Sequence, residues 1–161
     1  ILNLARSADP EMQELDAAEL AEEVMLLTRT KFATARIRPE LKVPSRGTAK
    51  IRGDRSLLEQ ALLNLVLNAV EAMPEGGDLR IEVKREEEGV ILAVQDQGPG
   101  MKKEVSERLF EPFLTRRPGG TGLGLALVRR TVEAHAGTVR VHSKPGKGTR
   151  VEIRLPKPVS A

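Results

Sequence analysis

The stretch LLNLVLNAVEAM, residues 62–73, decides most of the fold. Its apolar residues recur at helical spacing and the pattern begins earlier, so a helix is predicted from Asp54 to Met73. Asp54 is a good N-cap, and Pro74, Gly76 and Gly77 stop the helix. One stripe of this helix is predicted to be buried, comprising Leu58, Leu62, Leu65, Ala69 and Met73.

On the N-terminal side, a second helix is predicted from Asp16 to about Ala35. Alternation over residues 37–43 predicts a strand, in which Pro39 suits a sheet edge. A short strand follows at residues 49–52. The buried face of the second helix would carry Leu20, Val24, Leu27 and Lys31.

On the C-terminal side, a short helix is predicted from Lys103 and a longer one from about Gly122 to Ala136. The order of elements predicts an α+β fold, a two-layer sandwich whose mixed, mostly antiparallel sheet is covered by helices. Two β-hairpins complete it, with strands at residues 79–86, 90–95, 138–143 and 149–155.

The composition narrows the possible functions. Of 161 residues, 40% are hydrophobic and 30% are charged, as in a soluble globular domain. With three Phe as the only aromatic residues and a net charge of +3 spread along the chain, no nucleic-acid partner is expected. The absence of cysteine excludes disulfides and thiolate metal sites. No apolar run is long enough to span a bilayer, and a cytoplasmic location is expected.

Asn64 and Asn68 are unusual in so apolar a helix, because Asn is a weak helix former. Spaced four residues apart, they lie on one edge of the helix, and Glu71 continues that edge. An amide oxygen is a suitable ligand for Mg²⁺. The alternative is a solvated polar face, or a hydrogen bond from the helix to a loop.

Two glycine-rich stretches follow. In DQGPGM, residues 96–101, Asp96 ends a strand and could accept a hydrogen bond from an exocyclic amine such as that of adenine. Alternatively, Asp96 bonds its own backbone in a tight turn. In GGTGLGLALV, residues 119–128, glycines lead into a helix whose first N–H groups favour phosphate, unless this is simply a flexible loop.

Two of the three Phe lie in LFEPFLTRR, residues 109–117. Phe110 and Phe113 are expected to anchor a loop to the core. Arg116 and Arg117 would then lie beside the glycine loop, where they could meet phosphate charge. GKGTRV, residues 146–151, predicts a hairpin turn.

Together and in this order, these segments resemble the N box, glycine boxes and F box of sensor histidine kinases. The resemblance covers about residues 15–155, and NAVEAM and FEPF look most like the nitrogen-regulation type. The matching pattern is Asn64-x-x-x-Asn68, Asp96-x-Gly98-x-Gly100, Phe110-x-x-Phe113, Gly120-x-Gly122-Leu123-Gly124-Leu125 and Gly146-x-Gly148-Thr149.

The resemblance implies the Bergerat fold of gyrase-type and chaperone ATPases. It implies a domain that binds ATP with Mg²⁺, leaves ADP, and donates the γ-phosphoryl group to a histidine on a dimerisation domain of the same protein, with a response regulator as a further partner. The parent protein would be a homodimer, membrane-anchored or not, and this piece a monomer. Residues 1–14 would end a dimerisation helix and its linker, residues 15–156 would bind ATP, and residues 157–161 would be a tail.

The resemblance also implies roles for single residues. Asn68 would coordinate Mg²⁺ with Asn64 alongside, and Asp96 would bind the adenine amine with Thr149 nearby. Residues 116–120 would form a mobile lid. The remaining nucleotide contacts would come from Gly98, Gly100, Gly120, Thr121, Gly122, Leu123, Gly124 and Leu125.

Two departures from the family pattern matter. Many members carry Lys three residues after the Mg²⁺-binding Asn, where this chain has Glu71, so Arg116 or Arg117 would supply the cation opposite the phosphates. The family's phosphoacceptor is a His followed by an acidic residue. His135 precedes Ala and His142 precedes Ser, so a structural role is expected for both, and the acceptor lies outside the chain.

Three other functions are compatible with the boxes. ATP hydrolases of the gyrase type place a Glu where this chain has Asn64, which is no general base near neutral pH. Serine kinases of the anti-sigma type share the boxes, but the helix remnant before Leu15 favours a sensor kinase. A degenerate module without catalysis ranks last, because the boxes are intact.

Overall fold

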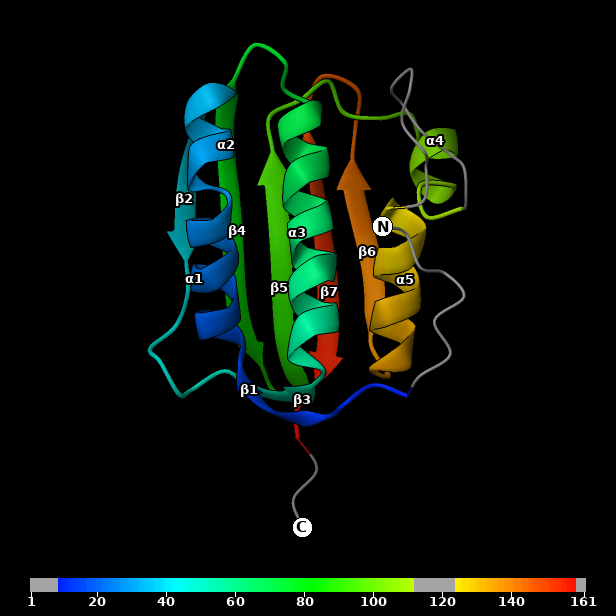
Figure 1. Cartoon of the computed structure of the whole chain (residues 1–161). Coiled ribbons are helices and arrows are strands. Elements are labelled where there is room, and N and C mark those ends of the chain that lie inside the picture. Colours follow the sequence, from blue (N-terminus) through cyan, green and yellow to red (C-terminus); the bar gives the residue numbers. More distant parts are fainter. Residues whose placement is uncertain (1–8, 112–123, 159–161) are drawn as a thin grey trace.

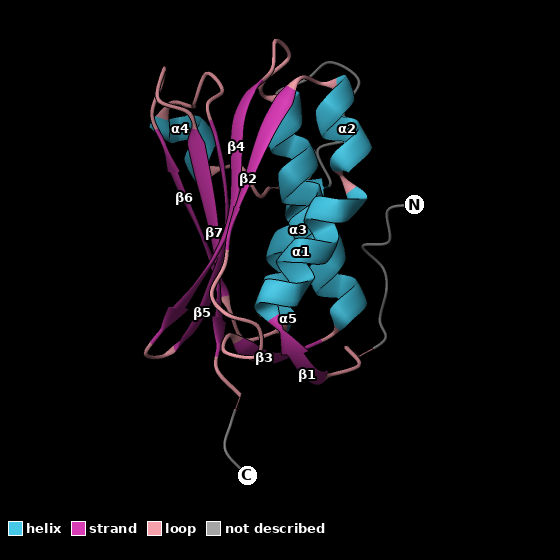
Figure 2. Cartoon of the chain, turned by 90° about the vertical axis from the view of Figure 1, so that its left-hand side faces the viewer, coloured by secondary structure: helices cyan, strands magenta, loops and turns pink. Residues whose placement is uncertain are grey.

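The computed structural model describes residues 9–111 and 124–158. In Figure 1, α1, α2, α3 and α5 lie in front of a sheet, and Figure 2 shows all four on the same face of it. The elements are β1 (Gln13–Asp16), α1 (Ala17–Leu27), α2 (Arg29–Thr34), β2 (Ile37–Lys42), β3 (Lys50–Gly53), α3 (Arg55–Glu71), β4 (Gly77–Glu86), β5 (Gly89–Asp96), α4 (Lys103–Glu107), α5 (Gly124–Ala134), β6 (Thr138–Ser143) and β7 (Thr149–Pro156).

Five strands form the main sheet, in the order β2-β4-β5-β7-β6. β2 runs parallel to β4, and the other neighbouring pairs are antiparallel. Pro39 lies in β2, at the edge of the sheet, as predicted. The predicted α+β sandwich, with a mixed and mostly antiparallel sheet under helices, is therefore confirmed. In the described residues, no helix is both long and apolar enough to cross a membrane.

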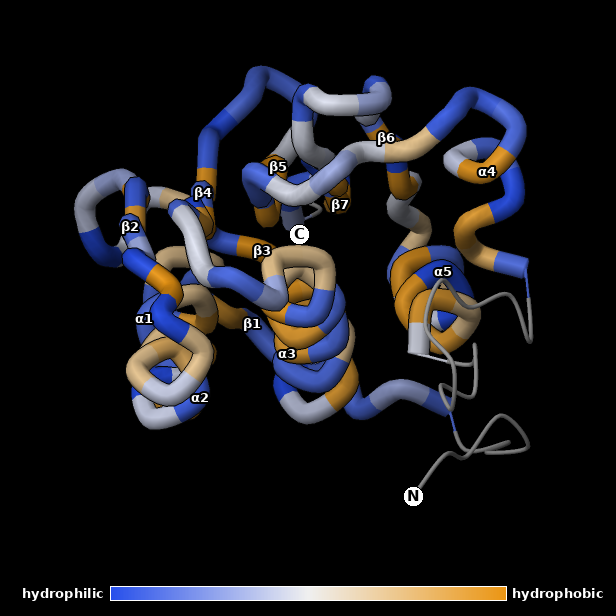
Figure 3. The backbone as a smooth tube through the Cα atoms, turned by 90° about the horizontal axis from the view of Figure 1, so that it is seen from above, coloured by the Kyte–Doolittle hydropathy of each residue, from blue (hydrophilic) through white to orange (hydrophobic). Residues whose placement is uncertain are grey.

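The core lies between α3 and the inner face of the sheet, and Figure 3 shows the two layers end-on. The predicted stripe of α3 is buried throughout, since none of its five residues is more than 4% exposed. Asp54 caps α3 as predicted, and its Oδ1 accepts a hydrogen bond from the Leu57 N–H at 3.1 Å. The strands opposite contribute Val90, Leu92, Val94, Val151, Ile153 and Leu155 to the same core.

The helix predicted before β2 is broken into α1 and α2. Between them lies Thr28, whose backbone departs from helical values with φ −98° and ψ 1°, and whose hydroxyl also donates to the Val24 carbonyl oxygen at 2.8 Å. The buried positions continue from Val24 through Thr28 to Phe32, at a spacing of four residues. Val24 is buried as predicted, but the predictions for Leu27 and Lys31 are wrong: both are exposed, and Phe32 takes the buried position instead.

A second, two-stranded sheet lies at one end of the main one. It pairs β1 with β3, and β1 was not predicted because its four residues are too few to show a period. Just before β1, the backbone N–H of Glu11 donates to Asp54 Oδ2 at 2.9 Å. The chain thus contacts the N-terminal end of α3 from residue 11 onward. The domain boundary expected after residue 14 stays a prediction. Of residues 1–14, where the resemblance implies the end of a dimerisation helix and its linker, residues 1–8 lie outside the described residues.

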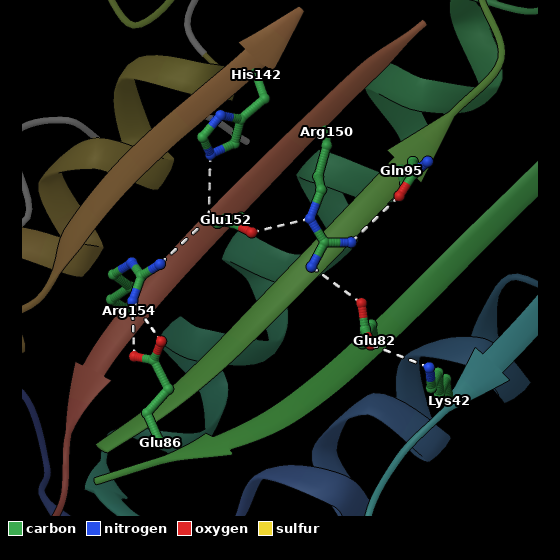
Figure 4. A network of polar contacts seen from close by, with 8 residues as sticks. All are labelled: Lys42, Glu82, Glu86, Gln95, His142, Arg150, Glu152 and Arg154. Atoms are coloured by element: carbon green, nitrogen blue, oxygen red, sulfur yellow. Dashed lines mark hydrogen bonds and ion pairs between the residues drawn. The ribbon is translucent and has the colours of Figure 1, made fainter. Parts of the chain in front are cut away.

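The outer face of the sheet carries cross-strand ion pairs, shown in Figure 4. Arg150 lies at the centre, with 2.9 Å from Nη2 to Glu82 Oε1 and 2.9 Å from Nε to Glu152 Oε2. The carboxylate of Glu152 also contacts His142 and Arg154. Its side chain is only 10% exposed. Arg150 and Arg154 therefore lie on the face of the sheet opposite α1, α2, α3 and α5 (Figure 2, Figure 4).

Glu152 links this network to pH. Burial works to raise the pKa of Glu152, but the hydrogen bonds from Arg150 and His142 outweigh it and hold the pKa below its usual value of 4.5. A folded-state pKa below the unfolded one means that the ionised carboxylate stabilises the fold above the unfolded pKa. This contribution is lost as the pH falls through the folded-state pKa.

We expect Glu152→Gln to lower the unfolding free energy by about 1–3 kcal/mol at pH 7, because it removes charged hydrogen bonds. The loss should shrink as the pH falls below 4.5, the usual pKa, and vanish once the pH is also below the lower pKa of the folded state. Urea unfolding between pH 7 and pH 3 measures both. Glu14→Gln is the control, since Glu14 pairs with Lys50 at an exposed site. A pH profile that Glu152→Gln leaves unchanged would contradict the assignment.

Candidate functional site

The two Asn side chains of α3 lie on the edge of the helix that faces α5. Both are half-buried. Asn64 Nδ2 lies 3.5 Å from the carbonyl oxygen of Gly124, the first residue of α5, a long hydrogen bond. A Cβ added at Gly124 would come within 4.0 Å of Asn64 Cγ. The N motif and the end of the glycine-rich segment are therefore neighbours, although 60 positions separate them.

Asp96 ends β5 on the inner face of the sheet and is only 6% exposed. Its Oδ1 accepts a hydrogen bond from the Gly98 N–H at 2.8 Å, so the tight-turn alternative describes this oxygen correctly. A Cβ added at Gly98 would lie 2.8 Å from the Ala72 carbonyl oxygen. The loop after Asp96 thus packs against the C-terminal end of α3.

Thr149 is the direct partner of Asp96 on the neighbouring strand β7. Residues directly opposite each other in an antiparallel pair project to the same face, with Cβ atoms about 4.5–5.5 Å apart. Both residues are buried at the end of the strands nearest the glycine loops. The structure therefore brings together the Thr149 hydroxyl and the Asp96 carboxylate, which the family resemblance implies lie near each other.

The two glycine turns of the sequence interlock. The N–H of Gly146 donates to the Pro99 carbonyl oxygen at 2.6 Å. A Cβ on Gly100 would overlap the Lys144 carbonyl oxygen, and one on Gly148 would overlap the Asp96 carbonyl oxygen. The backbones of the two loops touch, which explains why glycine stands at both positions without reference to a ligand.

Several predicted site residues lie outside the described part of the chain. They are Phe113, Arg116, Arg117, Gly120, Thr121, Gly122 and Leu123, together with the predicted lid at residues 116–120. At the borders of this segment, Phe110 and Leu125 are half-buried and pack against the core. Phe110 thus anchors its loop as expected.

A family model decides the relationship of this chain to known proteins. The model of the histidine kinase-, DNA gyrase B- and HSP90-like ATPases matches residues 53–159. The chain belongs to this family. Within it, the chain is a catalytic, ATP-binding domain of the sensor histidine kinase type.

Relatives agree with this assignment to the histidine kinases. The signal transduction histidine-protein kinase AtoS of Escherichia coli (strain K12) is 34% identical over 157 residues, which are 97% of this chain and 26% of AtoS. The nucleotide-free catalytic domain of the histidine kinase ThkA superposes with a TM-score of 0.83 at 30% identity, covering 91% of this chain and 98% of that one. Full-length ShkA in complex with AMPPNP gives a TM-score of 0.85 at 30% identity, over 98% of this chain and 33% of ShkA. The chain thus spans about a quarter of its curated relative.

Neither histidine of this kinase domain resembles a phosphoacceptor. His135 is 4% exposed, and its Nε2 accepts from the Asp54 N–H at 3.0 Å, so its Nδ1–H donates to the Thr131 carbonyl oxygen at 2.7 Å. His142 lies on the outer face of the sheet against Glu152. These contacts agree with the structural role expected of both.

Proposed function

We propose that this domain binds Mg-ATP and donates the γ-phosphoryl group to a histidine on the dimerisation domain of its parent protein, within two-component signalling. The observation that carries the proposal is the pairing of motifs that lie far apart in the sequence. Asn64 meets the start of α5, Gly98 packs on the end of α3, and Asp96 pairs with Thr149. Family membership makes ATP the nucleotide expected there.

Asp96 is the residue proposed to recognise the adenine amine. One of its carboxylate oxygens is engaged by Gly98, and a carboxylate has acceptor capacity for further donors. Thr149 stands beside it on β7. Gly98 and Gly100 shape this end of the site through the loop they hold close to α3 and to the β6–β7 turn.

Asn68, with Asn64 alongside, is proposed to hold Mg²⁺ through its amide oxygen. The residues fit this ion, because Mg²⁺ takes oxygen ligands, retains several waters and is usually shared with substrate phosphates. Both side chains are half-buried, and Asn64 lies at the border between α3 and α5. When bound, the ion would neutralise charge on the phosphates.

The phosphates themselves are proposed to bind the glycine segment that leads into α5. Gly124 begins that helix, whose first N–H groups favour an anion. The contacts proposed for Gly120, Thr121, Gly122, Leu123 and Leu125, and the phosphate cation proposed for Arg116 or Arg117, remain predictions. The exposed Glu71 has no assigned role.

The rival function is ATP hydrolysis or serine phosphorylation by the same fold. Asn64 argues against a hydrolase, because an amide cannot take a proton from water near neutral pH. A solved complex of ThkA contains the response regulator protein TrrA, and it superposes on this chain with a TM-score of 0.80 at 28% identity. By analogy we propose a response regulator as a partner. The cytoplasmic location, the homodimeric parent and the monomeric isolated domain stay predictions.

We expect Asp96→Asn to weaken ATP binding by about 1–3 kcal/mol, the scale for stranding a buried polar group. The amide oxygen of the new Asn would stay with the Gly98 N–H, which needs an acceptor. The amide NH₂ would then face the adenine amine, so two donors would oppose each other. Titration calorimetry measures the loss. Asp78→Asn on the neighbouring strand, with its side chain 54% exposed, is the control. Equal affinity of the wild type for ATP and GTP would refute the assignment of Asp96 to adenine.

A further inference from the structure

Three polar side chains lie in one row on the inner face of the sheet, across β6, β7 and β5. Ser143, Thr149 and Asp96 are successive partners on β6, β7 and β5. Thr149 and Asp96 are buried and Ser143 is half-buried. The inward residues further along these strands are aliphatic. Since buried polar groups need partners, the hydrogen bonds within the row determine what it can offer a ligand.

Ser143 is the most heavily engaged member of the row. Its Oγ accepts from the Met101 N–H at 2.9 Å, lies 3.0 Å from the Gly148 carbonyl oxygen, and lies 2.8 Å from Thr149 Oγ1. Ser143 thus binds Met101 in the loop that follows Asp96, Gly148 just before β7, and Thr149, the first residue of β7. Nothing in the sequence motifs pointed to it.

The direction of each hydrogen in this group follows from the inventory of donors and acceptors. A serine hydroxyl has one hydrogen and two lone pairs. The Gly148 carbonyl can only accept, so it takes the Ser143 hydrogen, and the Met101 N–H takes one lone pair. The hydroxyl of Thr149 must therefore donate its own hydrogen to the second lone pair of Ser143.

We propose that Ser143 is a positioning residue that fixes the Thr149 hydroxyl as a hydrogen-bond acceptor toward the nucleotide base. With its hydrogen directed to Ser143, Thr149 offers only lone pairs on its other side, next to the carboxylate of Asp96. Two adjacent acceptors suit the amine edge of adenine, or a water held there, and disfavour the keto oxygen of guanine. The inference rests on the proposed function, because it assumes that adenine binds at Asp96.

The test compares ATP with purine riboside 5′-triphosphate, which lacks the 6-amino group, by competition binding to the whole chain. We expect Ser143→Ala to weaken ATP roughly three- to tenfold, the equivalent of one hydrogen bond, and to leave the analogue within about twofold. Ser143→Thr, which keeps the hydroxyl, should restore the preference for ATP. A loss of fold alone would weaken both nucleotides together, so equal losses, or none, overturn the proposal.

A double-mutant cycle isolates the route through Thr149. Thr149→Val removes the hydroxyl at nearly constant volume, and in that background Ser143→Ala should no longer change the ratio of ATP to analogue affinity. An equal change of the ratio in both backgrounds overturns the proposal. Asp96→Asn separates the two hypotheses: if it abolishes the preference for ATP while Ser143→Ala does not, the adenine site stands and the role of Ser143 falls. If the wild type shows no preference, the proposed recognition of the adenine amine by Asp96, on which this inference rests, fails.

Discussion

Gly148→Ala is expected to lower the unfolding free energy by about 2–5 kcal/mol, a large part of the 5–15 kcal/mol typical of a domain. Gly148 has φ +76°, a region that costs an L-residue about 1–2 kcal/mol. In addition, the new Cβ would overlap the backbone oxygen of Asp96, which can move only if β5 and β7 separate at their paired ends. Denaturant titration with the slope held constant measures the loss.

Gly146 supplies a matched control two residues away. It has φ +77°, almost the same backbone conformation, but a Cβ there meets no atom within 4 Å. Gly146→Ala should therefore cost only the backbone term, about 1–2 kcal/mol. The difference between the two variants measures the interlocking of the loops. Similar losses in both would mean that the loops do not touch as described.

The same pair of turns shows where inference from sequence stops. Gly100 and Gly148 belong to motifs that resemble nucleotide-binding boxes, which suggests that a ligand requires them. In the structure, the neighbouring loop already requires both. The need for glycine at these positions depends on how two turns that are distant in the sequence pack together, which no local sequence pattern shows. Ser143 was missed for a similar reason, because only the pairing register of β6 and β7 places it beside Thr149.

The sequence was sufficient to predict an element where its apolar pattern extends over many residues or its first residue is a strong cap. Seventeen residues of α3, with Asp54 before them and Pro74 soon after, left little choice of structure. α1 and α2 were harder, because the backbone departs from helical values at Thr28, a residue type that a helix also accepts. The convergence of Asn64 with Gly124 could be expected only from the family resemblance, since 60 positions separate them.

The second large effect concerns transfer of the γ-phosphoryl group from ATP to a histidine. We expect the isolated chain not to label itself from γ-labelled ATP, but to label a separately added dimerisation domain of the parent that carries the phosphoacceptor histidine. Phosphoryl transfer depends mainly on positioning and on neutralising charge. The proposed Mg²⁺ ligand and phosphate segment would supply both, whereas His135 is buried with both ring nitrogens engaged. Label that is acid-labile and base-stable identifies phosphohistidine.

Asn68→Ala should reduce this transfer on the order of a hundredfold or more, because the metal is worth several kcal/mol in the transition state. Gln60→Ala removes an exposed amide from the same helix and is the control, with transfer unchanged. In the intact protein a tether would hold the domains at an effective concentration on the order of millimolar, so the separated pieces should react slowly and in proportion to the concentration of either.

Stable label on His135 or His142 would contradict the structural role of these residues. If the chain instead releases free phosphate rapidly and this release is lost on mutating Asn64, the domain is a hydrolase. In that case Asn64, beside Gly124, would take part in the attack of water on ATP.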